Sequence, residues 1–183
     1  LGVRWSPLLA VLTAILCAFY GWKYKAFMGE HTIFATRNFY GAMRVTQDSP
    51  DGAQWGSRFL VHGLITHGAQ PTWPAARQFA GTYFGRTSGI GLALARSVPS
   101  PRRVGVIGLG VGTLAVYGRA GDVFRFYEIN PEVVDIAHRY FSYLKDSPAT
   151  VEIVMGDGRA SLNRETSQRF DVLAADAFSG DGV

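Results

Sequence analysis

Three patterns of hydrophobic and polar positions follow one another along the chain, and the first is a continuous apolar segment. Residues 5–22 include no charged side chain, Lys23 and Lys25 follow them, and aromatic residues stand near both ends. A membrane-spanning helix needs about 20 apolar residues, with aromatic and basic residues at its ends. The pattern predicts a hydrophobic helix over residues 1–28 that anchors the chain in a membrane, with the rest of the chain in the cytoplasm. A buried helix and a cleaved signal peptide are the alternatives, although the residues around Cys17 make a poor cleavage site.

The second pattern, over residues 32–74, alternates aromatic or branched residues with polar ones, as half-buried strands do. Turn signals stand at residues 49–52 (SPDG) and at His62–Gly63. This segment is predicted to form a small antiparallel β-hairpin domain. His62 and His67 flank the second turn and could line a crevice, but their place beside the turn favours an interpretation as turn residues.

The third pattern, over residues 75–183, alternates short apolar runs with segments of helical character. The runs are RVGVIGL, DVFRFYEI, VEIVMGD and FDVLAADAF. Helices are predicted near residues 90–96, from Thr113 onward, and over 130–141, where Asn130 is a good N-cap and Pro131 suits the first position. Such alternation predicts an α/β fold, a Rossmann-like domain with a parallel sheet, whose ligand lies beyond the carboxyl ends of the strands. Since the chain begins without methionine and ends just after the fourth run, we expect part of a longer protein, with this domain truncated at its C-terminus.

A glycine-rich turn, GLGVGT, follows the first of these strands and carries Gly108, Gly110 and Gly112. The NAD fingerprint G-x-G-x-x-G would place its third glycine where this chain has Thr113. The observed G-x-G-x-G spacing is commoner in adenosylmethionine sites. A tight turn without a ligand is the alternative.

Acidic residues end the next three strands. Glu128, 20 positions after Gly108, is suited to bind ribose hydroxyls. Asp157, between two glycines, is suited to the adenine amino group, and Asp176 could orient and deprotonate an amine nucleophile. Each acid alone could be a surface or turn residue, but parallel strand ends converge, so the three are expected to share one crevice.

Seven motifs together resemble the spermidine synthase family of aminopropyltransferases, in particular the bacterial type that is fused to a membrane region. They are RNFYGAMRV, FLVHGLITHGAQ, TYFGRTSGIGLAL, VGVIGLGVGTLAVYG, YEINPEVVDIA, GDGRA and ADAFSGD. The resemblance implies a small β-domain followed by a methyltransferase-type Rossmann domain, and a habit of forming homodimers. It also implies site roles: the three glycines border the ligand, Glu128 holds ribose, Asp157 holds adenine, Asp176 is catalytic, Gln70 is a ligand-side glutamine and Tyr83 is a substrate-pocket tyrosine.

The chain departs from this family at several pocket acids. Val111 replaces an acid inside the glycine loop, Ala80 and Gly81 replace an Asp-Glu pair before the pocket tyrosine, and Ser179 replaces a second Asp. Acids at both ends of such a pocket hold the two ammonium groups of putrescine. Their loss weakens the expectation of a diamine substrate, for which Asp181 offers partial compensation.

The resulting functional hypothesis is a transferase that binds S-adenosylmethionine or its decarboxylated form and passes an aminopropyl group to a small amine, as in polyamine biosynthesis. The alternatives are an S-adenosylmethionine-dependent methyltransferase and a non-catalytic domain that senses nucleosides or polyamines. Nucleic acid is not expected as a partner, because the net charge of +4 comes from scattered basic residues. One cysteine and no histidine pair at ligand spacing argue against disulfides and a metal site.

Overall fold

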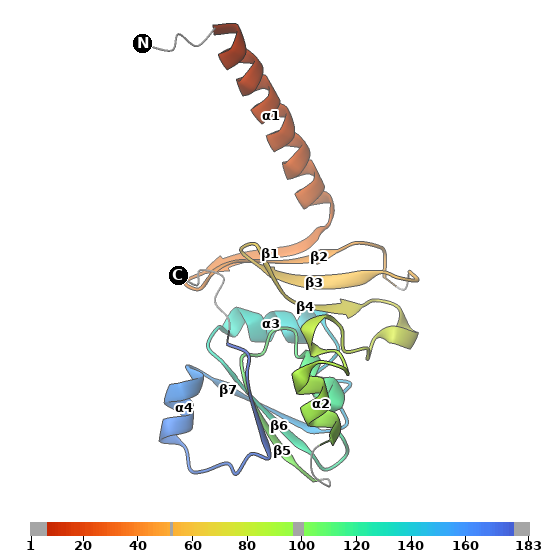
Figure 1. Ribbon diagram of the computed structural model, residues 1–183, viewed down its shortest axis with the longest axis vertical. Coiled ribbons are helices and arrows are strands. Elements are labelled where there is room, and N and C mark those ends of the chain that lie inside the picture. The colour runs from red at the N-terminus through yellow and green to blue at the C-terminus, as the bar shows by residue number, and fades with distance from the viewer. Residues whose placement is uncertain (1–6, 52, 97–100, 178–183) are drawn as a thin grey trace. The chain divides into compact units, whose positions relative to one another are not determined.

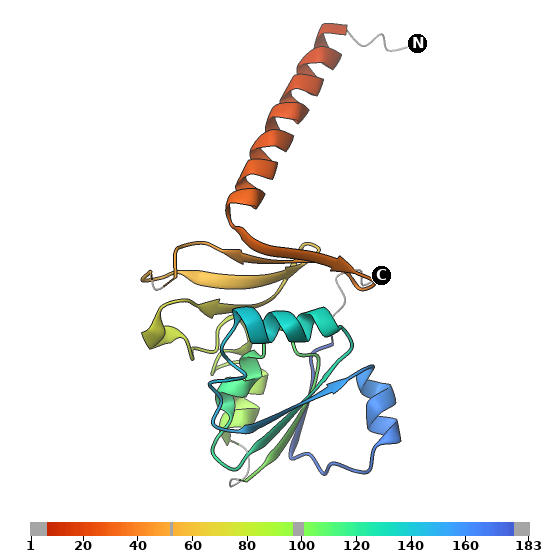
Figure 2. The same ribbon diagram turned by 180° about the vertical axis from the view of Figure 1, so that it is seen from behind.

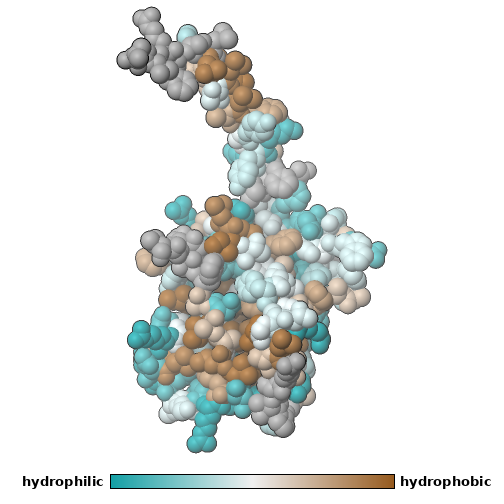
Figure 3. Space-filling model, in the orientation of Figure 1, coloured by the Kyte–Doolittle hydropathy of each residue, from teal (hydrophilic) through white to brown (hydrophobic). Residues whose placement is uncertain are grey.

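The computed structural model describes residues 7–51, 53–96 and 101–177. The chain divides into two compact units, Leu1–Thr32 and Ile33–Val183. The first unit contains helix α1 (Pro7–Glu30), which carries apolar side chains along much of its length (Figure 3). Its large side chains are about half exposed or more, among them Leu9, Val11, Leu12, Ile15, Leu16 and Phe19.

The structure gives no support to the membrane span predicted over residues 1–28. Among the described residues, no helix combines the length and the apolar character that crossing a bilayer requires.

An antiparallel sheet forms the first part of the second unit, as the alternating pattern predicts. Its strands are β1 (Thr32–Asn38), β2 (Gly41–Gln47), β3 (Ser57–His62) and β4 (Ile65–Pro71), in the order β1-β2-β3-β4. Met43, Val45 and Leu60 on the inner strands are almost completely buried. The sheet therefore has one apolar face that packs against the rest of the unit.

A parallel sheet forms the second part of this unit. Its strands are β5 (Arg103–Ile107), β6 (Val123–Glu128), β7 (Thr150–Met155) and β8 (Val172–Ala175), in the order β7-β6-β5-β8. The chain adds β6 and β7 on one side of β5 and then returns to its other side with β8. The strand order therefore reverses between β5 and β8, where α/β sheets bind their ligands.

The helices agree with the sequence predictions except in two places. Helices α2 (Gly89–Arg96) and α3 (Pro131–Tyr140) lie where they are predicted, and the Asn130 side chain caps α3 by accepting from the Glu132 N–H. The remaining elements are the 3₁₀ helices η1 (Pro74–Ala76), η2 (Thr82–Phe84) and η3 (Thr113–Tyr117), and helix α4 (Gly158–Arg164).

The helix predicted from Thr113 is only the single short turn η3. The backbone becomes extended at Gly118, where a Cβ atom would lie 2.6 Å from the Cβ of Ala149. Close packing against the segment before β7 thus ends the helix early. Helix α4 was not predicted from the sequence, and it starts at the Asp157 N-cap.

Helix α3 lies between the two sheets in both ribbon views (Figures 1 and 2). The side chain of Asn38, at the end of β1, donates to Asn130 Oδ1 over 2.6 Å. Farther along the helix, the ring centroids of Phe34 and Tyr140 are 5.1 Å apart. Contacts at both ends of α3 thus fix the antiparallel sheet over the strand ends of the parallel sheet.

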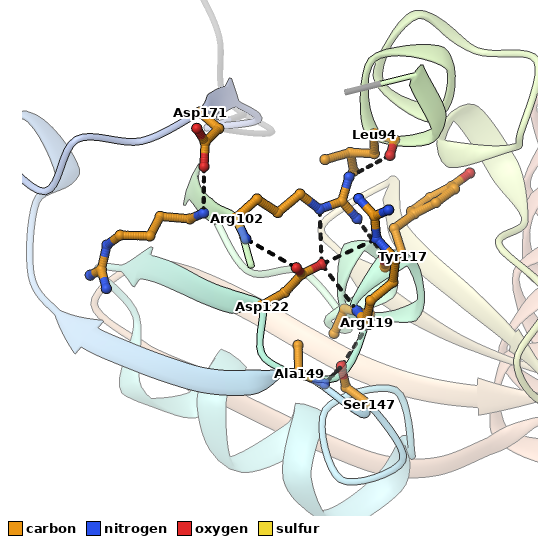
Figure 4. A network of polar contacts seen from close by, with 10 residues as sticks. Leu94, Arg102, Tyr117, Arg119, Asp122, Ser147, Ala149 and Asp171 are labelled. Atoms are coloured by element: carbon orange, nitrogen blue, oxygen red, sulfur yellow. Dashed lines mark hydrogen bonds and ion pairs between the residues drawn. The ribbon is translucent and has the colours of Figure 1, made fainter. Parts of the chain in front are cut away.

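A buried ion pair lies at the opposite, amino-terminal end of the parallel strands (Figure 4). Arg102 Nε donates to Asp122 Oδ2 over 2.9 Å, and the two side chains are 1% and 0% exposed. Asp122 also accepts from the backbone N–H groups of Arg102 and Arg119, and the guanidinium donates to the carbonyl oxygens of Leu94 and Tyr117. This network joins β5, β6, α2 and η3 far from the carboxyl ends of the strands.

Candidate functional site

A cavity of about 480 Å³ lies at the carboxyl ends of the parallel strands. Both sheets contribute to its wall. Its polar and glycine residues from the parallel sheet include Gly108, Gly110, Glu128, Asp157 and Asp176, and the antiparallel sheet adds Tyr40, Met43, Leu60, His62 and His67. Volumes of this order are typical of sites for small organic ligands.

The glycine loop after β5 has left-handed backbone conformations at its three glycines. Their φ angles are 95° at Gly108, 54° at Gly110 and 81° at Gly112, which side-chain-bearing residues rarely adopt. A Cβ atom would meet the Asp176 carbonyl oxygen at 2.6 Å from Gly108 and the His67 carbonyl oxygen at 2.6 Å from Gly110. The loop therefore lies in close contact with the end of β8 and with β4. Glycine is needed at Gly108 and Gly110 because a side chain would collide with this backbone, whether or not a ligand is bound.

Gly112 does not line the cavity. It is buried, and a Cβ atom there would lie 2.5 Å from Leu144 Cδ2. Because Gly112 has no side chain, Leu144 can pack directly against the backbone of the loop. Close packing is the role that the Rossmann pattern predicts for the last glycine of the loop.

Glu128 ends β6 and faces the cavity, with only 8% of its surface exposed. The Leu109 N–H donates to Oε2 over 3.0 Å, and the Asn130 N–H donates to Oε1 over 2.8 Å. Burial raises the pKa of this carboxyl, while the backbone hydrogen bonds oppose the shift. Both oxygens are oriented by backbone donors, and their remaining lone pairs are suited to accept from hydroxyl groups.

Asp157 follows β7 and has two roles. One oxygen, Oδ1, accepts from the Ala160 N–H over 2.7 Å and so caps helix α4. The residue also lines the cavity. The residue therefore acts as a local structural acid and also lies at the cavity, while its role toward adenine stays a prediction.

Asp176 follows β8 and lies beside the glycine loop. Its backbone N–H donates to the Ile107 carbonyl over 2.8 Å, which continues the pairing of β8 with β5. The side chain is partly buried, and this burial raises its pKa to about 6. A carboxyl that titrates near neutrality is suited to exchange a proton with a reacting amine.

Tyr83 lies in η2, outside the residues that line the cavity, and is 51% exposed. The pKa of its phenol is raised by burial and then by the negative charge of Asp176. The phenol is therefore within electrostatic reach of Asp176, as the predicted substrate-pocket role requires. The preceding residue, Thr82, has a φ of 57°, an uncommon backbone conformation for a β-branched residue.

Gln70 does not reach this cavity. It is 5% exposed, and its amide donates to the Arg77 carbonyl and to Ser142 Oγ while its carbonyl accepts from the Ser142 N–H. These contacts tie β4 to the segment after α3, so the structure gives Gln70 a packing role and does not bring it to the predicted ligand. Asp181 and Ser179 lie outside the described residues.

His62 and His67 line the cavity, the alternative that the sequence left open but favoured less than a role as turn residues. The turn at Gly63 is present, and the two rings stand 5.4 Å apart. His62 Nε2 donates to the Tyr40 carbonyl over 2.6 Å, and burial followed by the charge of His62 lowers the pKa of His67. A Cβ atom at Gly41 would lie 2.5 Å from His62 Nε2, so the glycine provides the room for this ring.

Tyr40 lines the cavity and is not among the site residues predicted from the sequence. It lies in the turn between β1 and β2, and although the motif RNFYGAMRV includes it, nothing in that motif marks it as facing a cavity. The glycine at position 41, which admits the His62 ring, is the one local signal beside it.

Val111, in the glycine loop after β5, is uncharged and cannot form an ion pair with a cationic substrate. Val111 is 1% exposed, and a Cβ atom at Gly68 would lie 2.5 Å from its Cγ2. Its side chain therefore packs against β4. Among the described residues, the cavity is lined by three carboxylates, of Glu128, Asp157 and Asp176, and by one guanidinium, of Arg159. This balance favours a cationic ligand.

No family model matches the chain. Two curated proteins that it resembles are putrescine N-methyltransferase 2 of Nicotiana attenuata and putrescine N-methyltransferase 2 of Nicotiana tabacum. Each is 26% identical over 132 residues, which cover 69% of this chain and 33% or 34% of the relative. The chain thus spans about a third of the length of the curated relatives it matches.

Three solved structures resemble this chain in fold. The spermidine synthase of Thermotoga maritima has a TM-score of 0.56 and 21% identity, with 80% of this chain and 47% of that chain covered. A spermidine synthase in complex with the transition state analogue AdoDATO has a TM-score of 0.57 and 21% identity, with 81% and 47% covered. A probable spermidine synthase of Corynebacterium glutamicum has a TM-score of 0.61 and 17% identity, with 80% and 52% covered. The chain has the mixed α/β fold of these spermidine synthases, with an antiparallel sheet before a parallel one.

Proposed function

We propose that this chain is the nucleoside-binding part of a transferase that moves an aminopropyl group from decarboxylated S-adenosylmethionine to a small amine. The single observation that carries the proposal is the convergence of Glu128, Asp157 and Asp176 on one cavity at the strand ends. The fold shared with spermidine synthases and the sequence similarity to putrescine N-methyltransferases support a transferase of polyamine metabolism. The cytoplasmic location and the homodimer stay predictions.

The residues of the cavity fit a nucleoside joined to a cation. Glu128 presents two oriented oxygens for ribose hydroxyls, and the glycine loop brings bare backbone to the same wall. Asp157 has one oxygen committed to α4 and a second that can accept from the adenine amino group. The acidic lining stabilises a positive charge on the ligand, and a sulfonium supplies that charge together with an electrophilic carbon.

Asp176 is the group that acts on the acceptor. Its carboxylate can hold the acceptor amine and take the proton that the nitrogen loses as the new C–N bond forms and the C–S bond of the sulfonium breaks, which releases methylthioadenosine. Tyr83 lies within electrostatic reach of Asp176 and can help to position the amine. The glycine loop offers no carboxylate to the acceptor, because Val111 stands there and is buried against β4. We therefore expect an acceptor that carries less positive charge than a diamine dication.

Transfer of a methyl group is the second candidate. It is favoured by the sequence similarity to putrescine N-methyltransferases, which is higher in identity than the similarity to the solved spermidine synthases. The same cavity would hold S-adenosylmethionine, and Asp176 would again receive the proton of the amine. The two reactions differ in which substituent of the sulfonium is transferred.

Titration calorimetry with S-adenosylmethionine, its decarboxylated form and methylthioadenosine tests these functions. Tighter binding of the decarboxylated form supports aminopropyl transfer, and tighter binding of the carboxylated form supports methyl transfer. Binding of nucleosides without turnover of any amine would leave only the sensing function. Binding of NAD in place of all three compounds would contradict the proposal.

We expect Glu128→Gln to weaken nucleoside binding by about tenfold or more. Both oxygens of Glu128 accept backbone N–H bonds, so one of these donors would face the amide NH₂ of the glutamine, and charge-assisted bonds to the ribose would be lost. Calorimetry on the variant measures the change. Glu132→Gln is the matched control, since Glu132 lies in the first turn of α3 outside the cavity lining. Equal affinity of wild type and Glu128→Gln would remove Glu128 from the ribose role.

The transferase rate is expected to rise with pH through about 6. Asp176 receives a proton only when it is ionised, and burial raises its pKa to about 6, above the ordinary value of 3.8. A raised carboxyl pKa also means that the native state binds more protons than the unfolded state at pH 4–6. The contribution of Asp176 to stability therefore falls as pH rises through this range. A pH profile of kcat/KM that stays flat between pH 5 and 7 would contradict this assignment.

A further inference from the structure

A second cavity, of about 200 Å³, lies in the same unit but shares no lining residue with the first. It is formed where β3, β4 and the segment after β4 meet the end of α3. Among the described residues, four arginine and lysine side chains line it, those of Arg58, Arg77, Arg139 and Lys145, together with His138, and Asp51 is the one carboxylate. Gln70, which the sequence placed at the nucleoside, forms part of this wall through its bonds to Ser142.

Part of this positive charge has a structural explanation. Arg58 donates to the Tyr140 carbonyl at the end of α3, to Gln47 Oε1 and to Asp51 Oδ1. Arg139 stands 5.5 Å from the ring centroids of Phe34 and Tyr140. Cations near the C-terminus of a helix compensate the negative end of its dipole, and this accounts for both arginines.

The same explanation does not account for Arg77 and Lys145, since in the described part of the chain neither donates to a carbonyl of α3. Among the described residues, the Arg77 guanidinium makes one hydrogen bond, a long one of 3.4 Å to the Thr72 carbonyl. The Lys145 ammonium has no hydrogen bond or ion pair within the described part of the chain. Thr72 is 6% exposed, and its hydroxyl lacks a hydrogen-bond partner there too. Three side chains with unused donors thus border one small cavity that already holds an excess of positive charge.

We propose that this second cavity binds a small anion that carries a phosphate or carboxylate group. Arg77 presents paired N–H donors that suit either group, and Lys145 adds a mobile positive charge. Arg58, held by its three partners, supplies a fixed charge at the cavity wall. The cavity has room for an oxyanion with a small substituent.

An anion in this cavity would join β4 to the end of α3. Both elements also reach the first cavity, since β4 carries His67 and α3 begins three residues after Glu128. We therefore expect binding to stabilise the fold, because a ligand that binds only the native state raises the unfolding temperature.

The test uses inorganic phosphate, with acetate and citrate as carboxylate probes, against sodium chloride at equal ionic strength. Calorimetry and thermal unfolding are expected to show a rise in Tm and saturable binding by at least one oxyanion beyond the effect of chloride. The probe that binds more tightly identifies the recognised group. No effect beyond that of chloride for any probe would overturn the proposal.

The double variant Arg77→Ala/Lys145→Ala is expected to weaken this binding by about tenfold or more, because it removes two charge-assisted donors. The control Arg86→Ala/Arg164→Ala removes the same charge from exposed positions that line neither cavity, and it should bind within about twofold of wild type. Circular dichroism checks that both variants are folded. Unchanged affinity in the Arg77/Lys145 variant, or an equal loss in the control, would assign the effect to overall charge and overturn the proposed site.

Discussion

Asp176→Asn is expected to lower the rate of transfer by about 10²–10⁴-fold while nucleoside affinity stays close to that of wild type. The expectation follows from the loss of the proton acceptor, since general-base catalysis contributes a factor of this size. The amide keeps the shape of the side chain, and the backbone bond from Asp176 to the Ile107 carbonyl does not depend on it. Steady-state kinetics and calorimetry on the same preparation separate the two effects.

The control for this experiment is Asp135→Asn, which neutralises an exposed carboxylate on α3 outside the cavity lining. It should leave both the rate and the affinity unchanged. If Asp176→Asn kept its turnover, Asp176 would have no role in catalysis. If it lost nucleoside affinity in the same proportion as rate, its role would be in binding.

Asp122→Asn is expected to destabilise the fold by about 3–5 kcal/mol, the usual cost of leaving one member of a buried ion pair without its partner. Arg102 is 2% exposed, so its guanidinium would keep a charge that neither water nor a carboxylate neutralises. The amide oxygen can still accept one backbone N–H, but Asp122 accepts on both oxygens, so the amide NH₂ would face another donor and add to the loss of charge. Unfolding in urea, with the slope m compared between proteins, measures the difference.

The double variant Arg102→Met/Asp122→Asn provides the check on this explanation. Because it removes the buried charge entirely, we expect it to be more stable than Asp122→Asn alone. Asp146→Asn, at an exposed position, should change stability by less than about 1 kcal/mol. A double variant less stable than Asp122→Asn alone would show that packing of the arginine stem, and not the unpaired charge, accounts for the loss.

Much of the local structure could be predicted because its signals lie within a few residues of one another. Asn130 and Pro131 mark the start of α3, and the structure shows the cap in place. Glu128 was located by its distance from the glycine loop and by the end of an apolar run. The same local approach missed the early end of η3, because Gly118 is constrained by Ala149, a residue 31 positions away.

Gln70 was predicted from the sequence to lie beside the ligand, but in the structure it lines the second cavity. Gln70 lies three positions after His67 on β4, and side chains on a strand alternate between its two faces, so the two residues point in opposite directions. His67 consequently reaches the first cavity and Gln70 reaches the second one. The sequence alone leaves open which face of β4 meets the glycine loop.

The sequence by itself determined the two kinds of sheet, the glycine loop and the three acids at successive strand ends, because each depends on spacing within one strand and the turn that follows it. Only the tertiary structure decided that His62, His67 and Tyr40 close the cavity, that Tyr83 comes within reach of Asp176, and that Arg77 and Lys145 share a second cavity. These neighbours are brought together by strand register and by the packing of the antiparallel sheet on α3. Such contacts join segments tens of residues apart, and no local pattern of hydrophobic and polar positions records them.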